Sequence, residues 1–103
     1  MKTRREMLEE FVALEPNDSF SRYALALELE KERGAEEAVP QLREVIARDP
    51  TYVAAYHQLG RLLAQTGFVE NARDAYSRGI EVASASGDQR ARSEMQEALD
   101  MLE

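Results

Sequence analysis

The sequence predicts an all-α fold in which antiparallel helix pairs repeat along the chain. Pro16 and Pro50 lie 34 residues apart, and each closes a stretch with the apolar spacing of an amphipathic helix. Sliding the chain by 34 residues places large apolar residues on large ones and small residues on small ones over most of its length. No stretch competes as a strand. We therefore expect a helical solenoid of about six helices, in which each unit packs on its neighbours.

Size, charge and cysteine content limit the classes of function. The chain has 103 residues, enough for one domain with a buried core. Its net charge is -7, so nucleic acid and anionic membranes are repelled on average. The chain has no cysteine, which excludes disulfides and thiolate zinc sites. No apolar run is long enough for a membrane span. We expect a cytoplasmic domain, residues 1–103, that binds neither nucleic acid nor membrane.

Capping residues, glycine and proline mark the ends of the predicted helices. Asn17, Asp18 or Ser19 can cap a helix N-terminus, because their side-chain oxygens accept hydrogen bonds from free backbone N–H groups. Gly34 and Gly67 are typical of helix C-termini. The helices are expected over residues 2–14, 19–33, 36–48, 52–65, 70–83 and 89–102.

These helices divide into a half-repeat, two complete repeats and a closing helix. The first helix aligns with the second helix of a repeat, Phe11 matching Val45. Pro40 falls in the first turn of the third helix or just past it, where a missing N–H costs least, so we expect no break there. The closing helix is rich in polar side chains and can serve as a cap. The expected boundaries are residues 1–16, 19–52, 53–86 and 87–102.

The unit resembles the tetratricopeptide repeat (TPR), whose 34-residue pattern is W-x2-L-G-x2-Y, then A-x3-F, then P. The second unit matches it with Tyr56, Leu59, Gly60, Leu63, Ala72 and Tyr76, and the first with Leu25, Ala26, Leu29, Ala38, Leu42 and Pro50. The departures are Arg22 in the aromatic position, Gly79 in place of Val45, and Ser84 in place of the closing proline. Without that proline, the second helix of the second unit can continue.

The small residues of the pattern have a packing role. Ala38 and Ala72 are expected where two helix backbones approach closely, as are Ala26 and Gly60. The larger Leu42 or Tyr76 then fills the seam between the two helices of one unit.

Residue patterns typical of catalysis are scarce. His57 is the single histidine, which leaves a metal site without a second imidazole or a thiolate. There is no glycine-rich phosphate loop and no nucleophile elbow. Paired acids such as Glu9 and Glu10 are more typical of a solvated helix face than of acid–base chemistry. We therefore expect neither an enzyme nor a bound cofactor or metal.

The first helix of the first unit carries a second apolar stripe. Phe20, Tyr23, Ala24 and Leu27 follow helical spacing on a face other than the one formed by Leu25 and Leu29. The TPR resemblance implies that this extra face lines a concave groove for an extended or helical segment of a partner protein. The predicted site is Phe20, Tyr23, Leu27, His57, Gln58, Arg61 and Arg92.

The residues of this predicted groove suit a segment with an apolar anchor and acidic flanks, because His57, Arg61 and Arg92 lie beside the apolar floor. Two alternatives stay open: the stripe packs against the N-terminal helix, or it forms a homodimer interface with a second copy of the chain. TPR domains that hold the C-terminal carboxylate of heat-shock chaperones use Lys, Asn, Asn, Lys and Arg. The matching positions here are Tyr23, Leu27, Gln58, Asp88 and Arg92, which disfavours that role.

Overall fold

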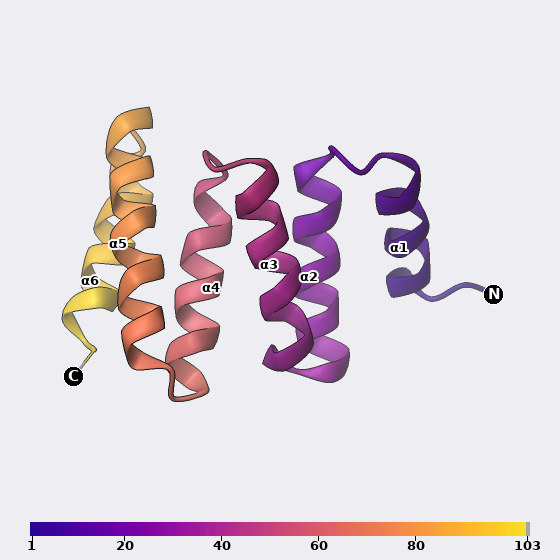
Figure 1. The fold of residues 1–103 in the computed structure, drawn as a ribbon, viewed down its shortest axis with the longest axis horizontal. Coiled ribbons are helices and arrows are strands. Elements are labelled where there is room, and N and C mark those ends of the chain that lie inside the picture. Colours follow the sequence, from indigo (N-terminus) through magenta and orange to yellow (C-terminus); the bar gives the residue numbers. More distant parts are fainter. Residues whose placement is uncertain (103) are drawn as a thin grey trace.

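The protein is a row of six helices, seen in a computed structural model that describes residues 1–102 (Figure 1). Each helix packs mainly on the one before and the one after it, and the described residues contain no strand. The all-α prediction is therefore confirmed. The helices are α1 (Arg4–Leu14), α2 (Ser19–Arg33), α3 (Ala35–Arg48), α4 (Val53–Gln65), α5 (Val69–Ser86) and α6 (Gln89–Asp100).

Two helix ends depart from the predicted positions in an informative way. Helix α5 runs on to Ser86, as the absence of proline at Ser84 allows, and ends at Gly87 with a left-handed φ of 78°. Helix α3 begins at Ala35, so Pro40 lies in its second turn. Because proline has no N–H, the carbonyl of Glu36 lacks its usual hydrogen bond from the residue four positions later. The helix nevertheless continues past Pro40 to Arg48.

The main core lies between helices α2 to α6 and uses the small residues as predicted. Ala26, Ala38 and Ala72 are completely buried. A Cβ added to Gly60 would come within 2.5 Å of the Tyr76 ring, which confirms close contact between α4 and α5. Buried large residues fill the remaining space, among them Leu42, Val45, Tyr56, Leu59, Leu62 and Met95.

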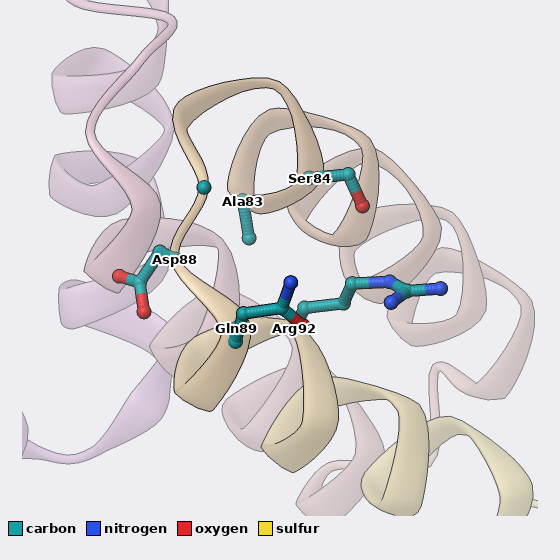
Figure 2. Close-up of a pocket in the computed structure, with 6 residues that line it drawn as sticks. Ala83, Ser84, Asp88, Gln89 and Arg92 are labelled. Carbon is teal, nitrogen blue, oxygen red and sulfur yellow. The ribbon is translucent and has the colours of Figure 1, made fainter.

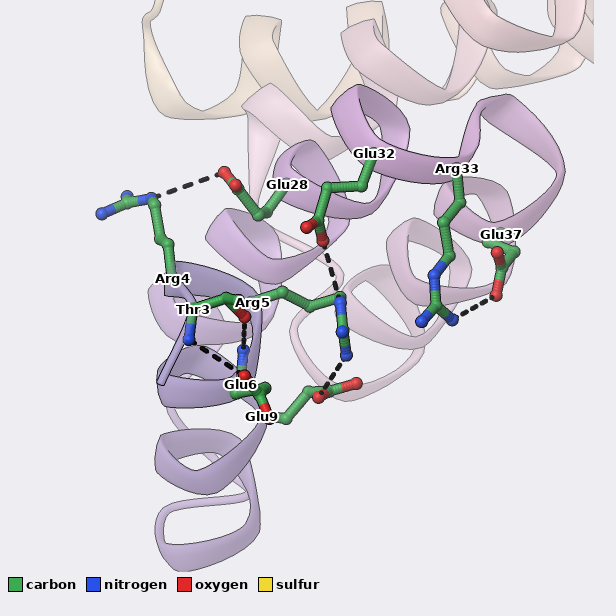
Figure 3. Close-up of polar contacts among 9 residues, drawn as sticks. All are labelled: Thr3, Arg4, Arg5, Glu6, Glu9, Glu28, Glu32, Arg33 and Glu37. Atoms are coloured by element: carbon green, nitrogen blue, oxygen red, sulfur yellow. Dashed lines mark hydrogen bonds and ion pairs between the residues drawn. The ribbon is translucent and has the colours of Figure 1, made fainter. Parts of the chain in front are cut away.

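Helix α1 is attached to α2 by a smaller apolar cluster and by ion pairs. Val12 is buried against Leu25 and Leu29 of α2, with Leu8 beside them. Figure 3 shows two arginines of α1 reaching toward glutamates of α2. The closest of these pairs joins Arg5 Nε to Glu32 at 2.9 Å. The N-terminus of α1 is closed by Thr3 and Glu6, whose side chains each accept a hydrogen bond from the other residue's backbone N–H.

The register of α6 corrects one element of the sequence alignment. Helices α2 and α4 begin 34 residues apart, at Ser19 and Val53, whereas α6 begins 36 residues after α4, at Gln89. The longer α5 accounts for the two additional residues. Met95 is fully buried, as Leu59 is, which follows from a shift of 36.

No helix among residues 1–102 combines the length and the apolar character needed to cross a bilayer.

Candidate functional site

Helices α2 and α4 present a shared face that carries most of the predicted groove residues. We call it the α2–α4 face and define it by Phe20, Leu27 and Glu30 of α2 with His57, Gln58 and Arg61 of α4. The two helices are joined across this face by a salt bridge between Glu30 and Arg61. A contact between Tyr23 of α2 and Tyr52, at the start of α4, lies nearby.

Arg61 is the best-fixed polar group of the face. Its guanidinium donates to both carboxylate oxygens of Glu30, at 2.7 and 3.0 Å, and to the side-chain oxygen of Gln58 at 2.6 and 2.9 Å. The Arg61 hydrogen bonds lower the pKa of Glu30 from its ordinary value, against the opposing effect of desolvation. The same hydrogen bonds raise the pKa of Arg61. The charge of Arg61 is therefore compensated within the protein.

Glu30 is not among the site residues predicted from the sequence, although the repeat period carries a signal for it. Glu30 follows Leu27 by one helical turn, and Leu27 is the equivalent of Arg61 in the first repeat. When equivalent helices of neighbouring repeats lie side by side, Arg61 of α4 lies next to its equivalent, Leu27 of α2. Its long side chain can then reach Glu30, one turn further along α2.

The apolar stripe of α2 is split between surface and core. Phe20 is 68% exposed, and Leu27 is partly exposed. Tyr23 instead packs against the main core, with its ring 5.2 Å from that of Tyr52. Neither Phe20 nor Tyr23 belongs to the cluster between α1 and α2, so the stripe is not packing for the N-terminal helix.

His57 occupies the α4 part of the face as a partly buried side chain. Its ring meets the ring of Tyr76 edge-on, with centroids 6.1 Å apart. Burial raises the pKa of the Tyr76 hydroxyl. Across residues 1–102, no group of three or more histidine, cysteine, aspartate or glutamate side chains is arranged to hold a metal ion.

The structure places Arg92 away from the other predicted site residues. With the shift of 36, Arg92 is equivalent to Tyr56 and not to Gln58. It lines a shallow hollow between the end of α5 and the start of α6, shared with Ala83, Ser84 and Gln89 (Figure 2). Asp88 caps α6 by accepting from the N–H of Ala91 at 3.1 Å. The positions of α6 equivalent to Gln58 and Arg61 are instead Glu94 and Glu97, both exposed.

A second apolar surface region was not predicted from the sequence. Phe68, which precedes α5, is 58% exposed and borders an open hollow with Val39, Pro40 and Leu63. The hollow contains none of the residues of the α2–α4 face. It offers a matched apolar reference for experiments on that face.

The comparisons with known proteins agree on the class of protein. The chain is 30% identical over 90 residues to a TPR repeat-containing protein of Pseudomonas aeruginosa, covering 87% of this chain and 86% of that protein. The solution structure of a tetratricopeptide repeat domain protein from Salinibacter ruber is 41% identical, with a TM-score of 0.78 over 82% of this chain and 86% of that one. No family model matches the chain.

A third comparison extends over nearly the whole chain. The solution structure of a protein from Bordetella parapertussis is 31% identical, with a TM-score of 0.81, and the match covers 97% of this chain and 87% of that chain. The chain belongs to the tetratricopeptide-repeat family. Domains of this family generally mediate protein–protein interactions and are typically non-enzymatic scaffolds.

Proposed function

We propose that the α2–α4 face binds a segment of a partner protein, with an apolar side chain of that segment against Phe20 and Leu27. The observation that carries this proposal is that α2 carries both the exposed aromatic ring of Phe20 and, about three turns further on, Glu30, whose salt bridge to Arg61 joins α2 to α4. An exposed apolar anchor site with a fixed polar border is the arrangement that orients a bound peptide.

The charges on and around the α2–α4 face support a partner other than the expected one with acidic flanks. Arg61 is already neutralised by Glu30, so an incoming carboxylate would compete with that pair. Helix α6 contacts α4, and its Glu97 takes the position equivalent to Arg61, while Glu94 pairs with Arg90 at 3.4 Å. Because the whole chain also has a net charge of -7, a segment with basic residues beside its apolar anchor is favoured.

Peptide selection followed by NMR mapping tests this proposal. We expect a phage-displayed random peptide library, selected on the intact protein, to yield peptides with an apolar residue and nearby Lys or Arg. Addition of such a peptide should shift the backbone amide signals of Phe20, Leu27, Gln58 and Glu97. Shifts gathered around Phe68 and Val39 would contradict the proposal. Concentration-dependent shifts at Phe20 and Leu27 without peptide would indicate the alternative, a homodimer through this same face.

A further inference from the structure

Helix α1 has an apolar outer side that no other helix covers. We call it the outer stripe and define it by Met7, Phe11 and Leu14, which follow i, i+4, i+7 spacing. Phe11 is 50% exposed and Leu14 is 80% exposed. The other side of α1 is the one that packs on α2, through Leu8 and Val12. Among residues 1–102, the outer stripe therefore has no apolar partner.

The positions equivalent to Phe11 in the other repeats are closed on both sides, whereas Arg48, the equivalent of Leu14, is exposed. Val45 of α3, which matches Phe11, is completely buried. Gly79 of α5 lies between Tyr56 of the preceding helix and Met95 of the following one, since a Cβ there would come within 2.6 Å of both. Within residues 1–102, α1 packs mainly on one helix, α2 (Figure 1). In these residues the Phe11 side of the outer stripe is thus an uncovered packing position, of the kind that a helix antiparallel to its own covers at Val45 and Gly79.

The two ends of the row of helices differ in polarity. The outward residues of α6 include Arg92, Gln96 and Asp100, and the Gln96 amide donates to Asp100 at 2.9 Å. A polar terminal helix of this kind shields the end of a helical solenoid from association. The α1 end has apolar residues at the corresponding place. Of these two surfaces, the outer stripe is the one suited to bury against another apolar surface.

We propose that a second copy of this chain occupies the outer stripe, with the two α1 helices packed antiparallel about a two-fold axis. The uncovered position requires a helix that runs opposite to α1, and a two-fold axis perpendicular to α1 supplies that direction. If the axis crosses α1 at the height of residue 9, midway between Met7 and Phe11, then Met7 of each copy contacts Phe11 of the other copy. Methionine sulfur against an aromatic ring is a favourable contact.

The charges of α1 favour the antiparallel arrangement. Arg4 continues the outer stripe at its N-terminal end. Its largely exposed guanidinium lies 3.5 Å from the carboxylate of Glu28 (Figure 3). Glu15 follows Leu14 at the other end, and its carboxylate makes no hydrogen bond or ion pair within residues 1–102. Antiparallel packing places Arg4 of each copy beside Glu15 of the other. The alternative, in which α1 packs on α6 of a second copy, is unfavourable because it would bury the outer stripe against the charged side chains of α6.

Sedimentation velocity over a concentration series tests the proposal on the full chain. We expect a monomer–dimer equilibrium, and Leu14→Glu should raise the dimer dissociation constant at least about tenfold. Met101→Glu is the matched control, because Met101 is 82% exposed at the other end of the chain. It should leave the equilibrium unchanged. A wild-type protein that stays monomeric throughout would overturn the proposal, as would equal effects of the two variants.

A charge swap tests the direction of packing separately from the apolar contact. Arg4→Glu and Glu15→Arg should each weaken the dimer, and the double variant should restore it, because each copy then presents the reversed pair to the other. Thermal unfolding of each variant checks that α1 still folds. A double variant weaker than both single variants would overturn the antiparallel arrangement. A dimer lost in Phe20→Ala but kept in Leu14→Glu would overturn the proposal in favour of the α2–α4 face.

The dimer and the proposed peptide site are separable in the same protein. A peptide selected for the α2–α4 face should bind Leu14→Glu with wild-type affinity, because Leu14 lies outside that face. If Leu14→Glu loses the dimer and keeps peptide binding, the outer stripe and the α2–α4 face are separate surfaces. If one of the two proposals fails, the other can still be tested in the same protein.

Discussion

Gly60 of α4 lies directly against the ring of Tyr76 of α5, so closely that a Cβ at Gly60 would sit 2.5 Å from Tyr76 Cε1. The first repeat places Ala26 and Leu42 at the same two positions, and both are completely buried. The second repeat thus combines the smaller glycine with the larger tyrosine, and the first combines alanine with leucine. Both pairs fill the seam between the two helices of their repeat.

This relationship predicts the stability of a glycine variant. Gly60→Ala should destabilise the fold by about 1–3 kcal/mol through overpacking, although alanine is favoured over glycine within a helix by about 1 kcal/mol. The double variant Gly60→Ala with Tyr76→Leu copies the first repeat and should lose less stability than the sum of its single variants. Denaturant unfolding measures all three. Additive losses would show that the two residues do not share one space.

The same seam limits residue size in α3 and α5. Ala38→Leu or Ala72→Leu should destabilise by about 1–3 kcal/mol, because both alanines are completely buried. Leucine is a good helix former, so helix propensity does not explain a loss. Ala47→Leu, on an exposed position of α3, is the control and should unfold as the wild type does. The account of the seam would be wrong if the buried and exposed variants unfolded alike.

The Glu30–Arg61 pair predicts a pH-dependent contribution to stability. The pKa of Glu30 lies below its ordinary value of 4.5 in the folded protein, because Arg61 hydrogen-bonds to the ionised carboxylate. A lowered folded-state pKa means that the stabilisation is complete above the unfolded-state pKa and is lost as the pH falls through the folded-state pKa. Near neutral pH, Glu30→Gln should therefore cost about 0.5–1 kcal/mol, the range of partly exposed ion pairs.

The difference between wild type and Glu30→Gln should begin to shrink as the pH falls to about 4.5, the ordinary pKa, and should disappear as the pH falls through the lower pKa of the folded-state carboxylate. Thermal unfolding over a pH series measures it. A difference that stays constant into strong acid would show that the pair contributes packing and no charge interaction.

The repeat architecture was predictable from the sequence because packing constraints recur at a fixed period. Ala38 and Ala72 mark the same close approach twice, and the prolines at 16 and 50 mark equivalent ends. The start of α6 at Gln89 was predicted, but the groove residues were placed on α6 with the strict 34-residue period, whereas α5 continues to Ser86 before Gly87 ends it and shifts the equivalent positions to 36. With a shift of 36 residues and not 34, Arg92 is no longer equivalent to Gln58, and Glu97 is the α6 residue equivalent to Arg61.

The polar part of the site was only half visible in the sequence. Arg61 stood out as a cation beside apolar residues, but its partner Glu30 lies 31 residues earlier in the chain. Such a pair depends on how two repeats stack, which local spacing does not give. Tyr23 is only partly exposed for a similar reason, since the ring of Tyr52, at the start of α4, packs against its ring.

The corrected register also predicts which charges govern peptide affinity. Glu97→Lys should weaken a selected peptide with basic flanks, through lost charge complementarity, and the effect should diminish at high salt. Arg92→Glu, which replaces an exposed cation by an anion in the hollow that Arg92 shares with Glu97, should not weaken the same peptide. Isothermal titration measures both. A loss of affinity in Arg92→Glu without one in Glu97→Lys would contradict a partner with basic flanks.

The most direct test of the proposed function compares two exposed phenylalanines. Phe20 lies on the α2–α4 face and Phe68 borders the separate hollow, and their exposures are similar at 68% and 58%. We expect Phe20→Ala to weaken a selected peptide at least about tenfold, as loss of an interface anchor does, and Phe68→Ala to leave its affinity unchanged. Equal affinities for the two variants, or a loss confined to Phe68→Ala, would contradict binding at the α2–α4 face.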